Sequence, residues 1–317
     1  MIVTVTLNAA VDRTLTVPNF QPGHRHRASQ GLTLAGGKGI NVARALKRLE
    51  VPVVATGLAG GRTGVRVVEE LTAEAILNDF VRITEESRTS TAVVDPMIGS
   101  YTEINEWGPS VGPEELEILL GKLQYLAAAA DMVVLAGSLP RDVSDDFYSD
   151  AIRLLNRRGL RTVLDAAGEP FRHGIEAEPW LVSPNQHEVE GLVGQELNDQ
   201  EDFLMELETI AELGARNVLI TREDVCFGLS RDERRTRRFH APAPRVDAVS
   251  AVGSGDVLLA AFLAARLADR TFEEALRNAV AAGTASTLEL GAGRFDPREA
   301  ARLAAAVNVE ELEPVVS

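Results

Sequence analysis

Short apolar runs that suit buried strands alternate with longer segments of helical periodicity along most of this 317-residue chain. Strands of a parallel sheet are buried on both faces, so they read as continuous apolar runs, and each crossover between them needs a helix. The pattern predicts an α/β fold in which a mostly parallel central sheet is covered by helices on both faces. The predicted strands lie at 2–7, 52–58, 132–140, 161–166, 180–183 and 217–221, with a hairpin joining 226–230 to 237–241. The predicted helices lie at 35–49 (after a glycine loop), 64–74, 114–130, 144–158, 199–213 and beyond 255.

Two stretches interrupt this alternation, residues 13–34 and 89–105, because each reads as a pair of strands without a helix between them. Paired antiparallel, these strands would form a small second sheet outside the main one. Such an appendage suits a lid over a ligand or a contact between two copies of the chain. We therefore expect residues 1–317 to form a single domain that carries this lid sheet.

The composition excludes several classes of protein. A formal net charge of −15 argues against a nucleic-acid-binding surface, which needs a clustered basic face. No apolar run is long enough to span a membrane, and the N-terminal residues lack the features of a signal peptide. The single cysteine, Cys226, rules out an internal disulfide and fits a reducing compartment. We expect a cytoplasmic protein with no nucleic-acid or membrane partner.

The stretch SAVGSGDVLLAAFLA, residues 250–264, places two glycines and an aspartate directly before an apolar helical run. One interpretation is an ordinary helix N-cap, in which Asp accepts hydrogen bonds from free backbone N–H groups. Asp256 lies too late in the stretch for that, since a cap precedes its helix. The other interpretation is that Gly253 and Gly255 leave backbone N–H groups free to face an anion, with Asp256 beside it for proton chemistry.

A second glycine-rich stretch, AGGKGINVA at 35–43, leads into a predicted helix. Gly36, Gly37 and Gly39 allow the backbone to approach a ligand closely. Lys38 adds a positive charge, and Asn41 falls in the first turn of the helix. A tight strand-to-helix turn with a solvated lysine is the plainer interpretation, but a second anion-directed loop elsewhere in the chain favours a binding site.

Polar residues after the first strand extend this site. In a parallel α/β sheet, ligands bind beyond the carboxyl ends of the strands, where Asn8 and Asp12 are expected. A carboxylate there suits hydrogen bonding to sugar hydroxyls, although an Asx-turn would use it as well. Arg88 precedes a predicted lid strand, where a guanidinium either binds a phosphate with two hydrogen bonds or is simply solvated.

Other motifs give weaker signals. The chain has neither the GxxxxGK[ST] loop of P-loop proteins nor a GxGxxG motif after its first strand. His24 and His26 share one exposed face of a predicted lid strand, but they lack the further ligands of a metal site. Cys226 has no base beside it in the sequence, which argues against a catalytic nucleophile.

Taken together, the motifs resemble the PfkB, or ribokinase-like, carbohydrate kinase family, and within it the branch of fructose-1-phosphate kinase, tagatose-6-phosphate kinase and the minor 6-phosphofructokinase. The resemblance covers essentially the whole chain. It is carried, in order, by TLNAAVDRT, AGGKGINVARAL, ATGLAGG, SRTSTA, YTEINEWGP, VVLAGSLP, VSPNQHE and AVGSGD. It implies a ribokinase-like fold with a β-sheet lid, and it accounts for the missing P-loop, since this family binds phosphates with its GxGD loop.

The resemblance also implies a role for each matching residue. Asp256 would be the base that takes the proton from the attacking sugar hydroxyl, and Gly253, Ser254 and Gly255 would form the anion hole for the transferred phosphoryl group. The sugar would be held by Asn8, Asp12, Gly37, Lys38, Asn41 and Ser138, with Lys38 and Arg88 near the phosphate that it already carries. The cofactor ATP would be bound by Asn185, Glu188, Thr221, Glu223, Asn278, Gly253 and Gly255. The second cofactor, Mg²⁺, would be held by Glu188 through water.

The sequence departs from the family pattern near the nucleotide. The usual [ST]-x-G-x-x-G loop reads TREDVC at 221–226, with Glu223 and Cys226 in place of both glycines, and Ser183 stands where a lysine often precedes PN. We expect the side chains at 223 and 226 to crowd the nucleotide and Glu223 to repel its phosphates. The basic run RDERRTRR at 231–238 would either compensate for this or form a solvated hairpin turn.

The sequence therefore predicts an ATP- and Mg²⁺-dependent kinase that phosphorylates fructose 1-phosphate at its 6-hydroxyl. Tagatose 6-phosphate or fructose 6-phosphate, phosphorylated at the 1-hydroxyl, is the alternative substrate, because one Lys/Arg pair can bind the phosphate of either kind. Two further alternatives are a sugar-phosphate sensor that has lost catalysis and a nucleoside or ribose kinase on the same fold. A homodimer through the lid sheets is also expected, since exposed sheet edges tend to be paired or covered.

Overall fold

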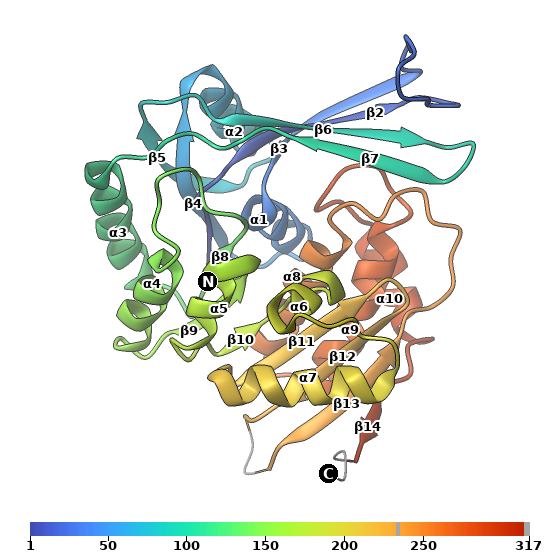
Figure 1. Ribbon diagram of the computed structural model, residues 1–317. Coiled ribbons are helices and arrows are strands. Elements are labelled where there is room, and N and C mark those ends of the chain that lie inside the picture. Colours follow the sequence, from blue (N-terminus) through green and yellow to red (C-terminus); the bar gives the residue numbers. More distant parts are fainter. Residues whose placement is uncertain (233–234, 314–317) are drawn as a thin grey trace.

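The computed structural model describes residues 1–232 and 235–313, which form two sheets and their covering helices (Figure 1). Over these ranges the large sheet has ten strands, and every pairing from β5 to β11 is parallel. Strands β11 to β14 pair antiparallel at one edge. The prediction of a mostly parallel central sheet is therefore confirmed. The spatial order is β14 (Glu310–Leu312), β13 (Arg237–Pro242), β12 (Val225–Ser230), β11 (Asn217–Arg222), β10 (Leu181–Val182), β9 (Arg161–Asp165), β8 (Met132–Ala136), β1 (Ile2–Thr6), β4 (Val53–Gly60) and β5 (Leu77–Ile83).

Helices cover both faces of the large sheet, as the continuous apolar strands require. In β8, Val133 and Leu135 face one apolar core, whereas Met132, Val134 and Ala136 face the other. The first core is covered by α3 (Pro113–Ala127), α4 (Phe147–Asn156), α5 (Gly168–Ile175), α6 (Gln186–Val193) and α7 (Gln200–Leu213). The second core is covered by α1 (Lys38–Arg48), α2 (Gly61–Ala73), α8 (Ser254–Leu267), α9 (Phe272–Ser286) and α10 (Pro297–Ala304). None of these helices, over the described residues, is long and apolar enough to cross a membrane.

The small sheet extends from the main body above one end of the large sheet (Figure 1). Its order is β3 (Gln30–Gly36), β2 (Ala10–Thr16), β6 (Arg88–Asp95) and β7 (Ser100–Asn105). The strands within each predicted pair are antiparallel, but β2 and β6 are joined by parallel pairing. The expectation of a purely antiparallel second sheet was therefore wrong at its centre, because β2 and β6 both leave the large sheet in the same direction.

Several elements have no counterpart among the predicted ones. Strand β5 is an edge strand with alternating exposure, so it lacks the continuous apolar run of the central strands. Helices α5 and α6 have eight residues each, too few for a clear helical periodicity. Strand β14 has three residues and forms by pairing with β13, which local sequence does not reveal.

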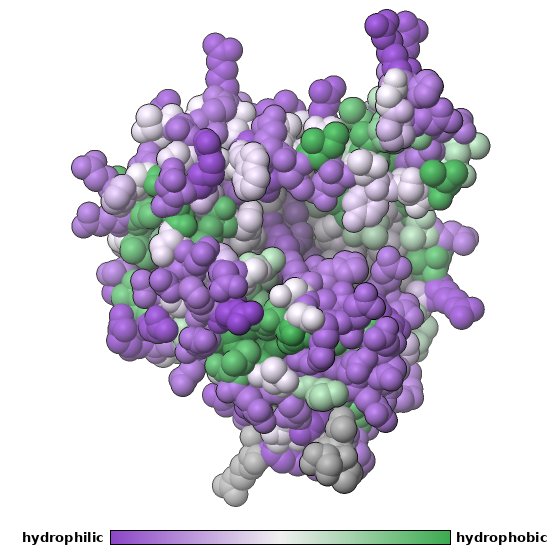
Figure 2. All heavy atoms as spheres, in the orientation of Figure 1, coloured by the Kyte–Doolittle hydropathy of each residue, from purple (hydrophilic) through white to green (hydrophobic). Residues whose placement is uncertain are grey.

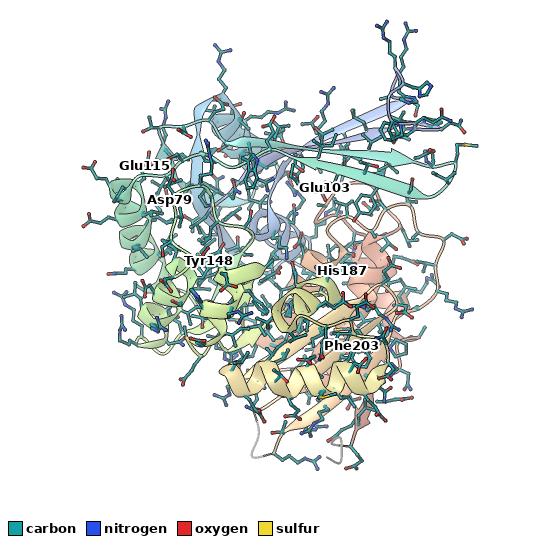
Figure 3. All side chains as sticks on the ribbon, in the orientation of Figure 1. Asp79, Glu103, Glu115, Tyr148, His187 and Phe203 are labelled. Carbon is teal, nitrogen blue, oxygen red and sulfur yellow. The ribbon has the colours of Figure 1, made fainter. Side chains whose placement is uncertain are left out.

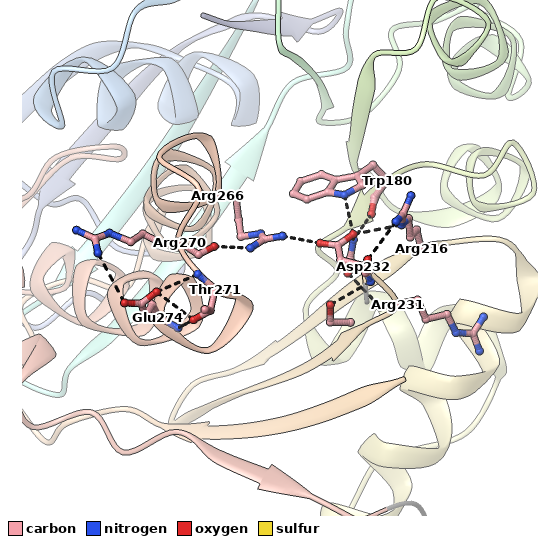
Figure 4. A network of polar contacts seen from close by, with 10 residues as sticks. Trp180, Arg216, Arg231, Asp232, Arg266, Arg270, Thr271 and Glu274 are labelled. Atoms are coloured by element: carbon pink, nitrogen blue, oxygen red, sulfur yellow. Dashed lines mark hydrogen bonds and ion pairs between the residues drawn. The ribbon is translucent and has the colours of Figure 1, made fainter. Parts of the chain in front are cut away.

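The edge of the large sheet opposite the carboxyl ends of its parallel strands is held by Asp232 (Figure 4). The Asp232 carboxylate accepts hydrogen bonds from Trp180 Nε1 at 3.1 Å, Asn217 Nδ2 at 2.9 Å and Arg266 Nη2 at 2.6 Å, and it forms an ion pair with Arg216. Because Arg266 lies in the last turn of α8, this carboxylate ties the C-terminal end of α8 to the sheet. The N-terminal end of α8 lies at the opposite edge, where the strands end.

Candidate active site

A cleft of about 450 Å³ lies at the carboxyl ends of the parallel strands, where ligands bind in sheets of this kind. Its walls come from the segments after β1, β8 and β9, from the start of α1 and from the base of the small sheet. Figure 2 shows a hollow in the surface below the small sheet, with hydrophilic residues at its floor. Six predicted site residues line the cleft: Asn8, Gly37, Lys38, Arg88, Ser138 and Glu188.

The N-terminus of α8 has the free amides that the Gly-Ser-Gly-Asp sequence suggests. Gly253 has a left-handed backbone, with φ of 76°, and a Cβ there would lie 2.6 Å from the Cβ of Ala292. A Cβ at Gly255 would meet no atom within 4 Å, so this glycine leaves open space at the helix end. Within residues 1–232 and 235–313, the N–H groups of Gly255 and Asp256 have no hydrogen-bond acceptor. Free amides at a helix N-terminus suit an anion.

Asp256 lies beside these amides with its side chain almost fully buried at 7% exposure. Its Oδ2 accepts a hydrogen bond of 2.8 Å from Asn41 Nδ2. Burial raises the pKa of Asp256 to about 7, and the negative charge of Asp165 adds to the rise, whereas Lys38 and the Asn41 hydrogen bond oppose it. A carboxyl group with a pKa near neutrality can accept a proton at physiological pH.

The glycine stretch before α1 is shaped by close contacts with β1 and β2. A Cβ on Gly36 would lie 2.0 Å from the Asp12 carboxyl group, and one on Gly39 would lie 2.5 Å from Thr6 Oγ1. Asp12 is half-buried. Burial raises its pKa to about 6, with Arg88 opposing the rise and Glu103 adding to it. The side chain of Asp12 therefore fits over the loop because residue 36 is glycine.

Lys38 is bound by two carboxylates rather than left free. Its Nζ donates hydrogen bonds to Asp165 Oδ1 at 2.7 Å and to Glu188 Oε1 at 2.8 Å. Burial works against the charge of the ammonium, but Asp165, Glu188 and Asp256 raise the pKa of Lys38 well above its usual value. Asp165 was not singled out in the sequence. Its position near the carboxyl end of the predicted strand at 161–166 is the signal that could have found it, since ligands bind at that end of a parallel strand.

Asn185 and Glu188 are held by the start of α6. Asn185 is the N-cap, whose Oδ1 accepts from Glu188 N at 3.0 Å, and Glu188 Oε2 accepts from Asn185 N at 2.9 Å. This reciprocal pair is a capping box, so the N-x-x-E spacing has a structural role as well. Burial raises the pKa of Glu188 and Asp165 adds to the rise, while Lys38 opposes it. The capping box directs the remaining Glu188 oxygen towards Lys38.

Arg88 lies where the small sheet meets the cleft. Its guanidinium donates to the backbone oxygen of Asn8 at 3.3 Å and to Asn105 Oδ1 at 3.3 Å. The same Asn105 oxygen accepts a 2.5 Å hydrogen bond from Ser90. Neither Ser90 nor Asn105 was singled out, although both lie in motifs that carry the family resemblance. Asn8 donates to Ser138 Oγ at 3.1 Å.

Two cleft-lining residues, Thr6 and Asn8, each have a buried side-chain oxygen without a hydrogen-bond partner in the part of the chain that the structure describes. Within the described residues, the buried Oδ1 of Asn8 has no hydrogen-bond donor. A buried acceptor without a partner costs roughly 1 to 3 kcal/mol, which a ligand hydroxyl or ammonium group can recover. The Asn8 oxygen lies against Gly108, where a Cβ would come within 2.3 Å of it.

The predicted nucleotide residues lie at two places. Thr221 is bridged to Asn185, and its N–H donates to Pro184 O at 3.1 Å, so β11 ends beside the start of α6. Glu223 is exposed in the tight turn between β11 and β12. Asn278 is exposed on α9, five residues before Gly283, where a Cβ would lie 3.3 Å from the Ser254 carbonyl oxygen. Its nucleotide role stays a prediction.

Two expectations about the nucleotide are corrected. Cys226 is 1% exposed and belongs to the apolar core, where burial raises the pKa of its thiol, so it cannot crowd a ligand at the surface. The basic run at 231–238 lies at the other end of β12 from Glu223 and cannot compensate for its charge. Arg231 and Arg238 pair there with Glu208. Residues 233 and 234 of the run lie outside the described residues.

Free helix amides beside a buried carboxyl group, with the Lys38 ammonium close enough to act on the pKa of that group, are the parts that phosphoryl transfer needs. The site thus has the chemistry of a kinase. The chain belongs to the pfkB family of carbohydrate kinases, since the model of that family matches residues 3–299.

Comparisons with individual proteins support this family assignment. The 1-phosphofructokinase of Bacillus subtilis strain 168 is 34% identical over 297 residues, which is 93% of this chain and 96% of the relative. A possible 1-phosphofructokinase from Thermotoga maritima has a similar structure, with a TM-score of 0.90 at 26% identity over 99% of this chain and 100% of the other. Escherichia coli phosphofructokinase-2 in complex with substrates and products has a TM-score of 0.88 at 27% identity, over 96% and 98%.

Proposed function

We propose that this kinase transfers the γ-phosphoryl group of ATP to the 6-hydroxyl of fructose 1-phosphate, giving fructose 1,6-bisphosphate. The observation that carries the proposal is the buried Asp256 beside the free amides of Gly255 and Asp256, at the N-terminus of α8. The choice of fructose 1-phosphate follows relatives named 1-phosphofructokinase that are 31 to 34% identical over 91% or more of the chain.

In the proposed reaction Asp256 is the general base. The sugar hydroxyl oxygen attacks the γ-phosphorus, the bond from that phosphorus to the β–γ bridging oxygen breaks, and ADP leaves. The hydroxyl proton passes to the Asp256 carboxylate, whose other oxygen is held by Asn41. The amides of Gly253, Gly255 and Asp256 would donate to the oxygens of the transferred group, where negative charge must be stabilised. The amide of Ser254 already donates to the Ala251 carbonyl oxygen at 3.2 Å, so the role expected for it in the anion hole falls to Asp256.

The sugar phosphate would lie between the cleft floor and the small sheet, which would act as a lid of a single kinase domain. Asp12 and Asn8 would form hydrogen bonds with sugar hydroxyls. Gly37 and Asn41 would contact the sugar, and Ser138, whose Oγ accepts from Asn8 Nδ2, would donate its hydroxyl hydrogen to it. Arg88 is the cation better placed for the existing phosphate, because Lys38 is already bound to two carboxylates.

The residues present fit a hydrated Mg²⁺ ion better than one bound directly. The Lys38 ammonium lies between Asp165 and Glu188, so this group of three side chains keeps a net charge of −1 when both acids are ionised. Each Glu188 oxygen already accepts one hydrogen bond and can accept another from a metal-bound water. Magnesium retains several waters in such sites, and with ATP bound it would neutralise charge on the phosphates.

ATP itself would lie along the carboxyl edge of the sheet, between α6 and α8. Asn185, Thr221, Glu223 and Asn278 would be its contacts on the side away from the sugar. With Cys226 buried, Glu223 is the departure from the family pattern that bears on ATP affinity. We also propose a cytoplasmic location, which suits a sequence whose one cysteine, Cys226, is free and buried.

The test is a coupled ADP-release assay with Mg-ATP on fructose 1-phosphate, fructose 6-phosphate, tagatose 6-phosphate and the free sugars. We expect fructose 1-phosphate to have the highest kcat/KM and the Asp256→Asn variant to lose turnover. If the enzyme prefers tagatose 6-phosphate or fructose 6-phosphate, the proposed substrate is wrong but the proposed mechanism still holds. Binding of a sugar phosphate with no turnover would establish the sensor alternative.

We also propose that the small sheet forms a homodimer contact. Every residue of β7 is exposed. Ile104, at 60%, lies on one face of the small sheet and Tyr101, at 55%, on the other, while Met97 and Ile98 are exposed in the turn before β7. Exposed strands with apolar side chains are normally covered. Sedimentation velocity should show a dimer at micromolar concentration that Ile104→Asp dissociates. A monomeric wild-type chain would contradict the proposal.

A further inference from the structure

Arg44, in the second turn of α1, is a buried cation that the proposed chemistry does not use. Its side chain is 3% exposed. Nε and Nη2 both bind the Glu74 carboxylate, at 2.6 Å and 2.9 Å. Nη1 donates to Asn41 Oδ1 and to the Ala292 carbonyl oxygen, each at 3.2 Å, and Nη2 donates to the Ala35 carbonyl oxygen at 2.8 Å. The guanidinium therefore joins four separate parts of the chain.

The contact with Asn41 decides which way the Asn41 amide faces. A guanidinium group has only donors, and an ionised carboxylate has only acceptors. Asn41 lies between the two, with Arg44 on one side and Asp256 on the other. Its oxygen must face Arg44, so its NH₂ group must face Asp256. Asp256 has a raised pKa of about 7, and its protonated form can donate. Without Arg44 the amide could turn over and accept from protonated Asp256, which would favour the acid over the carboxylate.

The orientation of Asn41 in turn orients Asp256. The 2.8 Å hydrogen bond holds Oδ2, which leaves Oδ1 for the substrate hydroxyl. The other groups around this carboxyl are Asp165 at the end of β9, Lys38 on α1 and Asp12 on β2. Asp165 and Asp12 disfavour its ionised form and Lys38 favours it, so the Asn41 donor acts with Lys38 in keeping Asp256 a carboxylate.

Arg44 also holds the two loops that border this carboxyl. Ala35 precedes the glycine stretch of the sugar site. Ala292 packs on Gly253, where a Cβ would lie 2.6 Å from its own, and a Cβ on Gly293 would lie 2.6 Å from the Asn41 carbonyl oxygen. The Arg44 guanidinium thus contacts the segments that carry the glycine loop and the anion hole, and through Asn41 it is linked to Asp256.

We propose that Arg44 is a positioning residue for the catalytic base: it fixes the polarity of the Asn41 amide, which donates to Asp256 Oδ2 and presents Oδ1 to the sugar hydroxyl. This inference rests on the proposed function, in which Asp256 is the base. Arg44 acts through Asn41 and the two loops and does not contact the substrate.

The test compares Arg44→Lys with Arg48→Lys, one helical turn later. Arg48 also donates to a backbone oxygen of the C-terminal part, that of Phe295 at 2.8 Å, but has no link to Asn41. A lysine at 44 keeps the charge near Glu74 but cannot make the divided contacts of a guanidinium. We expect a fall in kcat of about tenfold or more for Arg44→Lys alone, with sugar-phosphate affinity changed less than about threefold. Equal effects at 44 and 48 would overturn the proposal.

The pH dependence of kcat/KM is a second measurement, and a general loss of stability in the variant would not shift it. Because Asp256 would lose a donor, the acidic limb of kcat/KM should move to higher pH by about one unit in Arg44→Lys. Asn41→Asp, which keeps Arg44 and replaces the donor with an acceptor, should move the limb in the same direction. If Asn41→Asp changes only KM, the orientation of this side chain does not act on the base and the proposal fails.

A measurement without turnover separates this inference from the proposed function. The difference in unfolding free energy between each chain and its Asp256→Asn counterpart, followed against pH, reports the pKa of Asp256 whether or not the enzyme is active. Arg44→Lys should raise that midpoint, and Arg48→Lys should leave it in place. An unchanged midpoint overturns the inference, whereas a raised midpoint in a chain that phosphorylates no ketose phosphate overturns the proposed function alone.

Discussion

The large and the small sheet are built from the same kind of strand but held in different ways. In the large sheet, β1 and β8 are buried along their whole length between two helical layers. In the small sheet, β7 is exposed at every residue. Figure 3 shows the contrast in side chains: Phe203 of α7 packs under the large sheet, and Glu103 of β7 projects below the small sheet towards the gap above the main body.

The difference in burial between the two sheets suggests that the large sheet supports the chemical step and the small sheet supports substrate binding. The groups proposed to carry the chemistry, Asp256, Lys38 and Glu188, lie on helix ends or strand ends anchored in the two cores. The small sheet brings Arg88 to the cleft and Glu103 to a pocket beside Asp12 and Asn41, without an apolar layer of its own. Burial on both faces fixes geometry, whereas a sheet with an open face can move relative to its ligand. Catalysis should therefore depend on the main body and substrate affinity on the small sheet.

The largest effect is expected in the main body, at Asp256. The substitution Asp256→Asn removes the base and should lower kcat by about 10²- to 10⁴-fold, the usual contribution of a general base. Substrate affinity should change little, because the amide keeps the shape of the carboxyl group. Steady-state kinetics with ADP release measures both quantities, and Asp247→Asn, at an exposed aspartate nine residues earlier, is the control. Retention of more than a tenth of the wild-type kcat would mean that another group takes the proton.

The next largest effect is on the free energy of unfolding, which should fall more for a substitution in the large sheet than for one in the small sheet. Leu135 in β8 is 0% exposed, so Leu135→Ala should lower the free energy of unfolding by about 2 to 5 kcal/mol through the cavity that it leaves. Ile104 in β7 is 60% exposed, and Ile104→Ala should change it by less than about 0.5 kcal/mol. Urea unfolding of dilute protein provides both values. A comparable loss at Ile104 would show that this face of the small sheet is buried in an assembly.

Arg88 tests the small sheet as a source of substrate affinity. Arg88→Leu removes a charge-assisted contact worth about 1.5 to 3 kcal/mol, which corresponds to a rise of about 10- to 100-fold in KM for the sugar phosphate. The value of kcat should stay within a few-fold, because Arg88 is not among the groups around Asp256. Arg82→Leu, at an exposed position of β5, is the control. A fall in kcat at constant KM would place Arg88 in the chemical step.

The smallest effect concerns pH and stability. Burial raises the pKa of Asp256 to about 7 in the folded chain, above its value of 3.8 in the unfolded one. A raised carboxyl pKa stabilises the fold at low pH, and this contribution is lost as the pH rises through about 7. The neutral Asp256→Asn variant should therefore unfold at a higher temperature than wild type at pH 8, and the gap should narrow towards pH 5. A gap that widens on acidification would show that Asp256 is ionised in the folded chain throughout.

Much of the fold could be read from the sequence, because strand burial and helix periodicity are local patterns. The runs at 2–7 and 132–140 become β1 and β8, and the glycine stretch before 40 does lead into α1. The parallel joining of β2 to β6 could not be read, since pairing between distant strands leaves no local signal. Strand β5 was missed for a related reason: as an edge strand it is only partly buried.

The sequence predicted which motifs form the candidate site, but it did not predict the contacts that their side chains make. Gly253 and Gly37 have the positive φ values that only glycine adopts easily, so their identity alone indicated special backbone. Cys226 was misjudged, because its orientation into the core depends on which face of β12 the helices cover. Asp165 was overlooked because it lies in no motif with an obvious chemical meaning. Arg44 was overlooked, although it lies within AGGKGINVARAL, because its partners Glu74 and Ala292 are distant in the sequence.

By itself the sequence determined the α/β alternation, the two glycine loops and the acidic residue at the start of α8, because each depends on residues that are neighbours in the chain. Only the tertiary structure decided that Lys38 pairs with Asp165 and Glu188, 127 and 150 positions away, and that Asn41 reaches Asp256 across 215 positions. Parallel strands end at one edge of the sheet, so folding brings together side chains that the sequence keeps far apart. At that edge, burial and the charges of neighbouring groups set the protonation of these side chains, which the residue type alone does not determine.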